Sequence, residues 1–255
     1  MTDFRSEITI LLPAFLTGLL VLATHVPLGK IVLDRGIVFI DLAIAQVAGL
    51  GVVTADFLGW EPNGWSVQAS AGVAALLSAG FLIWTERRLG ALQEAVIGVV
   101  FVVAASAEIL LLSFNPHGAE NLKDLLVGQI LWVVPEQLIP VAVLYAGVLA
   151  VAALVDLGRR RGLFYALFAV TVTASVQLVG VFLVFASLII PALAARAIAA
   201  TRPLAFAYGL GFAGYVLGLL ASLVLDLPTG AAIVCALALL AVVAGAAARP
   251  FAARR

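Results

Sequence analysis

A succession of apolar runs, each about as long as a bilayer is thick, constrains this chain most. Because an α-helix rises 1.5 Å per residue, about 20 apolar residues cross the hydrocarbon core. The chain has 255 residues, of which 64% are hydrophobic and 11% charged, whereas a soluble domain is about 25% charged. The candidate spans are residues 8–28, 37–58, 67–84, 95–114, 130–155, 163–179, 181–200, 204–225 and 229–248. The sequence therefore predicts an all-α integral membrane protein with about nine transmembrane helices, eight at the fewest.

Three stretches refine this prediction. Residues 163–200 form one apolar run broken at Val179–Gly180, which is compatible with two spans or with one span and a re-entrant segment. The longest outer connection is 114–128, and the segment LKDLLVGQILWV that begins within it predicts a short helix leading into the fifth span. Pro135 and Pro140 interrupt that span and predict a kink near its outer end. No polar stretch is long enough to fold alone, so residues 1–255 are expected to form one transmembrane domain.

The distribution of basic residues predicts the orientation of the chain. If the first span runs from outside to inside, 12 of the 14 Lys and Arg residues fall in inner segments, and only Arg5 and Lys123 lie outside. The positive-inside rule then places the N-terminus outside and the C-terminus in the cytoplasm, in the inner or plasma membrane of the cell. The N-terminus lacks the basic region of a signal peptide, so the first span is expected to be retained.

Composition also excludes several classes of function. The net charge is zero and no basic patch occurs, which argues against nucleic-acid binding. Cys235 is the only cysteine and Met1 the only methionine. An internal disulfide, a thiolate cluster and a thioether copper route are therefore not expected. The chain has no phosphate-binding loop motif, so we expect it to bind no cofactor and to hold no ATP by such a loop.

Polar residues near the inner ends of the first two spans are candidates for a translocation pathway. Asp41 is costly within a span, at about 2.5–3.5 kcal/mol on insertion scales, and such residues usually face a partner or a water-filled path. His25 lies at a similar height on the preceding antiparallel span, so the two side chains could pair directly or share a cation. A buried structural pair that pins the hairpin is the simpler interpretation. Gln46 lies five positions after Asp41, about 140° around the helix, and so occupies a different face.

Further polar side chains lie toward the outer side. Glu108, Glu136 and Gln177 fall in or near the outer parts of their spans, and Glu108 carries the greatest desolvation cost. His117 lies in the outer loop, where a solvated histidine is the simpler interpretation. The two histidines and the scattered acids do not predict a tight metal cage. A weak, transient metal pathway needs fewer ligands, and Asp41 and Glu108 are its candidate contacts.

Small residues recur in the eighth span, where Gly211, Gly214 and Gly218 lie on one side of the predicted helix. Glycine allows helices to approach closely in lipid. Ordinary packing within the chain is the simpler interpretation, and a dedicated dimer face is the alternative.

Several motifs together resemble the permease subunits of the metal-type ABC importers, which carry zinc, manganese or iron. They are the segments GKIVLDRGIVFIDLAIAQVAGLG (29–51), IGVVFVVAASAEILLLS, LVGQILWV, VQLVGVFLVFASLIIPALAARA (176–197) and DLPTGAAIV (226–234). The resemblance covers nearly the whole chain. It implies a homodimeric pore with cytoplasmic ATPase subunits that hydrolyse ATP, and an extracytoplasmic metal-binding protein. It also implies that Asp41 matches the acid of the family's second span.

The sequence departs from this family at two places. The family usually has a histidine four residues after the acid, where this chain has Ala45, and Gln46 is the nearest polar residue. The inner segment that precedes the sixth span is shortened to Asp156–Gly162, so the usual ATPase-docking contact is expected to be altered or carried by another inner loop.

The main hypothesis is therefore a permease subunit of an ATP-driven importer of divalent metal ions, with zinc first, then manganese or iron. A stand-alone secondary transporter, with Asp41 or Glu108 coupling to protons, is a second hypothesis. A non-transporting membrane scaffold is the third.

Overall fold

The computed structural model describes residues 4–60, 64–115, 118–198 and 201–252, and within these ranges the secondary structure is helical throughout. The elements are α1 (Phe4–Arg35), α2 (Ile40–Phe57), α3 (Trp65–Leu89), η1 (Gly90–Leu92), α4 (Gln93–Leu112), α5 (Gly118–Val127), η2 (Ile130–Trp132), α6 (Pro135–Leu154), α7 (Arg161–Val179), α8 (Val181–Ile198), α9 (Pro203–Leu225) and α10 (Thr229–Ala252).

The helices match the number of spans expected from the sequence. Eight stretches of the described chain are long and apolar enough to cross a membrane. One of them, Trp65–Leu112, contains both α3 and α4, which η1 joins into a hairpin. The prediction of eight or nine helical spans is confirmed.

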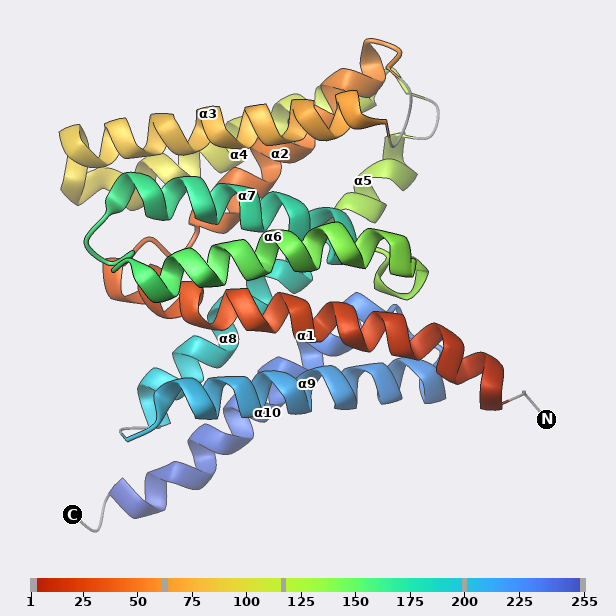
Figure 1. Cartoon of the computed structure of the whole chain (residues 1–255), viewed down its shortest axis with the longest axis vertical. Helices are drawn as coiled ribbons and strands as arrows, with labels where there is room; N and C mark the ends of the chain where they lie inside the picture. The colour runs from red at the N-terminus through yellow and green to blue at the C-terminus, as the bar shows by residue number, and fades with distance from the viewer. Residues whose placement is uncertain (1–3, 61–63, 116–117, 199–200, 253–255) are drawn as a thin grey trace.

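The long helices lie side by side, and the two ends of the chain emerge at opposite ends of the bundle (Figure 1). Helices α2, α7 and α8 are the most buried, whereas α6 and α10 expose most of their apolar surface. A helix that is apolar all round and exposed is typical of a membrane environment rather than of a soluble core. The core of the domain therefore lies around α2, α7 and α8.

The apolar run at 163–200 forms two helices that separate at Gly180. Gly180 has a φ of 79° and Gly128 a φ of 74°, a left-handed conformation that favours glycine. The two glycines press together backbone to backbone, and a side-chain carbon at either would clash with main-chain atoms of the other segment. The end of α5, the α7–α8 break and the start of α10 at Gly230 thus meet in one close contact.

The structure corrects the outer end of the fifth span. The expected helical span began at residue 130, but α6 begins at Pro135, and the preceding residues form the short 3₁₀ turn η2. Proline favours the first turn of a helix because it has no N–H to leave unpaired there. The short helix expected from residue 122 onward is α5, which starts earlier and ends at Val127, because Gly128 is left-handed.

The glycines of α9 pack within the chain. A side-chain carbon at Gly211 would lie 2.6 Å from Leu22 of α1, and carbons at Gly214 and Gly218 would clash with Leu237 and Ile233 of α10. These glycines bring α9 close to its own neighbours, α1 and α10.

Candidate functional site

Glu108 of α4 is buried in the seam between α2 and α4. Its side chain is 1% exposed. It lies over Gly49 of α2, where an added Cβ would be 2.7 Å from Glu108 Oε1. Its second oxygen, Oε2, has no hydrogen-bond partner among the described residues. A buried carboxyl group without a protein partner is costly, so it marks this seam as a site for a ligand or a proton.

A cavity of about 330 Å³ opens on the same seam. Its walls come from five helices and are almost wholly apolar, with Gln46 as the polar side chain. The lining residues are Leu42, Gln46, Phe101, Leu126, Val181, Phe182, Phe185, Ala186, Ile190 and Val234. Gln46 is buried, and no described residue forms a hydrogen bond with its amide.

Helical spacing places Glu108 on the same face of α4 as a residue that lines this cavity. Gln46 and Gly49 are three residues apart on α2 and therefore lie on the same face, about 4.5 Å apart along the axis. On α4, Phe101 lines the cavity and Glu108 follows it seven residues later, two turns along the same face. The carboxyl group of Glu108 and the amide of Gln46 thus belong to one strip along the α2–α4 seam.

Asp41 lies in the first turn of α2 and on another side of that helix. It is 1% exposed, and its Oδ1 has no hydrogen-bond partner in the described chain. Asp41 is absent from the cavity lining, whereas Gln46 is part of it, which agrees with the expected difference in face. Ala45, at the position of the family's histidine, is also buried.

His25 is buried on α1, and its Nδ1 lies 2.9 Å from the carbonyl oxygen of Val21 and 3.1 Å from Thr24 Oγ1. Its Nε2 has no partner among the described residues. The structure does not form the direct His25–Asp41 pair expected from the sequence, because the ring is held by its own helix. His25 and Asp41 are instead two separate buried groups near one end of the bundle.

The other polar candidates lie apart from this seam. Gln177, near the end of α7, and Glu136, in the first turn of α6, are exposed. His117 lies outside the described residues. Within the described ranges, no three His, Cys, Asp or Glu side chains gather in a group that could hold a metal ion.

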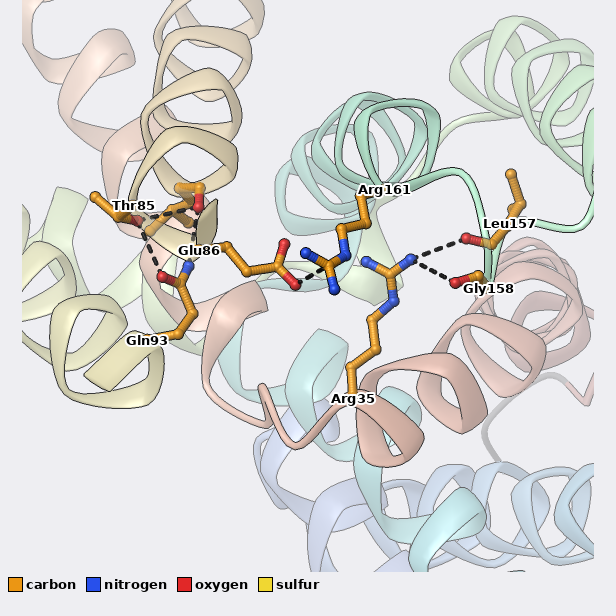
Figure 2. A network of polar contacts seen from close by, with 8 residues as sticks. Arg35, Thr85, Glu86, Gln93, Leu157, Gly158 and Arg161 are labelled. Carbon is orange, nitrogen blue, oxygen red and sulfur yellow. Dashed lines mark hydrogen bonds and ion pairs between the residues drawn. The ribbon is translucent and has the colours of Figure 1, made fainter. Parts of the chain in front are cut away.

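A second polar cluster ties the α6–α7 turn to the ends of α1 and α3 (Figure 2). Arg35 Nη2 donates hydrogen bonds to the carbonyl oxygens of Leu157 (3.0 Å) and Gly158 (3.1 Å). Its guanidinium carbon lies 4.4 Å from the centre of the Phe164 ring. Beside it, Arg161 Nε lies 3.5 Å from a carboxylate oxygen of Glu86. In the shortened segment expected at Asp156–Gly162, residues 156–160 form a turn held by these contacts, and Arg161 and Gly162 already begin α7.

The sequence analysis missed the neighbours of Glu108 in the α2–α4 seam and the main-chain partners of Arg35. Phe101 was not singled out, although its seven-residue spacing from Glu108 would have placed it on the same helix face. Arg35 was considered only as a charge that sets orientation. Its contacts are to main-chain carbonyl groups 122 and 123 residues away, and no sequence pattern shows such contacts.

The comparisons with known proteins agree with this architecture. The model of the ABC 3 transport family matches residues 7–160 and 149–248. The chain belongs to the ABC 3 transport family. It is similar to a structure of PsaBC from Streptococcus pneumoniae in complex with Fab, with a TM-score of 0.76, 20% identity and 94% of each chain covered. It is also similar to an inward-facing structure of a protein assigned as a metal-chelate type ABC transporter, with a TM-score of 0.69 and 17% identity, covering 96% of this chain and 89% of that one.

Membership gives the chain its general role. It is a multi-pass membrane permease of the ABC 3 family, a transport component whose ATPase activity lies in separate subunits.

Proposed function

We propose that this permease belongs to an importer that moves divalent metal ions, with zinc the first candidate, then manganese or iron. The observation that carries the proposal is the buried carboxyl group of Glu108, which lies over Gly49 without a protein partner for Oε2. An oxygen ligand of this kind suits a divalent cation in passage. Few ligands also favour release, which transport requires.

The proposed path follows the α2–α4 seam. Glu108 forms its outer part, and Gln46 contributes an amide oxygen where the cavity widens. Asp41 and His25, both buried with one unpartnered polar atom each, supply its inner part. Gln177 is exposed on α7 and is assigned to the outer entrance.

The chain works, in this proposal, as a homodimer with two cytoplasmic ATPase subunits and an extracytoplasmic metal-binding protein. The N-terminus lies outside and the basic ends of the helices face the cytoplasm, as the positive-inside rule predicts. ATP is bound by the partner subunits and not by this chain. Hydrolysis there switches the seam between outward and inward access.

Reconstitution with the matching subunits tests the proposal. The chain is co-purified with its ATPase, placed in liposomes with the binding protein, and assayed for ATP hydrolysis with zinc, manganese or iron(II) in turn. One metal should stimulate hydrolysis and accumulate in the liposomes, and Glu108→Gln should lower its uptake at least about tenfold, as loss of a charged ligand predicts. Glu136→Gln, which changes an exposed glutamate, is the matched control.

Two results would contradict the proposal. A stable complex that responds to none of the three metals would exclude free-metal import. Uptake by the purified chain without any ATPase would instead favour the secondary transporter.

A further inference from the structure

A cleft of about 260 Å³ lies between α1, α8 and α9, at the end of the bundle where α1 and α8 finish and α9 begins. Its walls are largely apolar and include Val26, Leu204 and Ala207. It shares no lining residue with the cavity on the α2–α4 seam. The cleft is therefore a separate site from the proposed translocation path.

Three charged side chains line this cleft. Lys30 Nζ lies 2.6 Å from Asp34 Oδ2, and Arg196 Nη1 lies 3.9 Å from Asp34 Oδ1. Arg196 also donates a hydrogen bond of 3.0 Å to the carbonyl oxygen of Leu33. Two cations thus share one carboxylate, which leaves one net positive charge.

These ion pairs are open to exchange. The side chains of Lys30, Asp34 and Arg196 are each half exposed or more, and exposed ion pairs contribute little stability. An incoming anion can therefore take the place of Asp34 beside either cation at small cost. A further cation, Arg202, precedes Pro203 of the cleft wall at the start of α9.

We propose that this cleft binds an anionic phospholipid, with the headgroup phosphate between Lys30 and Arg196. One acyl chain would then lie along the apolar wall. The position supports this assignment, because Lys30 lies five residues before the end of α1 and Arg196 in the last turn of α8, near the depth of lipid headgroups. Basic pockets between transmembrane helices are typical binding sites for anionic lipid headgroups. A soluble anion would use the cations but gain nothing from Val26, Leu204 and Ala207.

Lipid retention by the full chain tests this proposal. The protein is purified from mixed micelles that contain phosphatidylglycerol or phosphatidylcholine, and bound lipid is counted by native mass spectrometry. The wild type should retain phosphatidylglycerol in preference. Lys30→Gln with Arg196→Gln should lower that retention by about fivefold for each cation removed.

A second variant is expected to raise lipid retention, a result that misfolding cannot produce. Asp34→Asn removes the carboxylate that competes for both cations, so it should retain more phosphatidylglycerol than the wild type. The matched control is Arg87→Gln with Arg88→Gln, two exposed cations of α3 that do not line the cleft. That control should retain lipid as the wild type does.

Three results would overturn the proposal. The first is equal retention of the two lipids by the wild type. The second is an equal loss in the control, which would show a general charge effect. The third is labelling of a co-purified ATPase subunit, rather than lipid, by a photo-crosslinker at position 204, which would make the cleft a protein contact.

Discussion

At the scale of single residues, Gly49 and Glu108 form the most consequential contact. Glycine at position 49 leaves the room that the carboxyl group occupies, since an added Cβ would lie 2.7 Å from Glu108 Oε1. That distance is shorter than van der Waals contact, so a larger residue must displace the glutamate side chain. The position of the proposed metal ligand Glu108 is thus set by the absence of a side chain on the neighbouring helix.

Gly49→Ala is therefore expected to lower metal uptake about tenfold or more while Glu108 itself is unchanged. Small displacements of a ligand group cost large factors in function. Metal uptake by the reconstituted complex measures the effect. Gly98→Ala, on α4 itself, is the matched control, because an added Cβ there meets nothing within 4 Å. Wild-type uptake by Gly49→Ala would remove Glu108 from the pathway.

At the scale of elements, the contact between Gly128 and Gly180 holds α5 against the α7–α8 break. Gly128→Ala adds a side-chain carbon into main-chain atoms of Val179 and Gly180, at a left-handed φ. The expected loss is about 3 kcal/mol or more of unfolding free energy, from overpacking and backbone strain together. Denaturation of the purified chain in mixed micelles measures it.

The control for this loss is Gly59→Ala. Gly59 has a similar φ of 76°, but an added Cβ there meets nothing within 4 Å. It isolates the cost of the left-handed conformation, about 1–2 kcal/mol. An equal loss in the two variants would show that the contact with the α7–α8 break contributes nothing.

The α6–α7 turn is held by the hydrogen bonds that Arg35 donates to the carbonyl oxygens of Leu157 and Gly158. Arg35→Lys keeps the charge but cannot donate to two carbonyl groups while stacking on Phe164. If this turn transmits the ATPase cycle, the variant complex should keep its basal ATP hydrolysis but lose most of the stimulation of that hydrolysis by metal. Parallel assays of hydrolysis with and without metal give the stimulation ratio. Arg88→Lys, exposed at the end of α3, should leave the ratio unchanged, and an unchanged ratio in Arg35→Lys would contradict the link.

These elements also show how far sequence alone reaches. The helices were predictable because each span is an apolar run of the length that a bilayer requires, and Gly180 marks a break. Pro135 was expected to kink a span that had already begun, but it is the first residue of α6. For the candidate site, the sequence predicted individual polar residues but not which of them lie together. Which polar side chains meet depends on how α2 packs on α4, and His25 turns to its own Val21 rather than to Asp41. These contacts depend on how the helices pack against one another, which the sequence pattern does not show.

At the scale of the whole molecule, the described chain has nine helices long enough to span a membrane, and nine crossings predict that the two termini lie on opposite sides. The basic residues gather at the ends where α1, α3 and α8 finish and α7 and α9 begin. Since positively charged segments stay in the cytoplasm, the α3–α4 turn should face inward and the α9–α10 turn outward. This predicted orientation rests on charge, whereas the fold alone is compatible with either direction.

Cysteine accessibility tests this orientation directly. Cys235 is exposed and is the only cysteine, so Cys235→Ser provides a cysteine-free chain. Arg88→Cys then reports on the α3–α4 turn, and Asp226→Cys, at the exposed left-handed position before α10, reports on the other end. A membrane-impermeant maleimide should label Asp226→Cys in intact cells and Arg88→Cys only after permeabilisation. The reverse pattern would invert the bundle, move the basic ends outside, and leave the α6–α7 turn out of reach of any cytoplasmic ATPase.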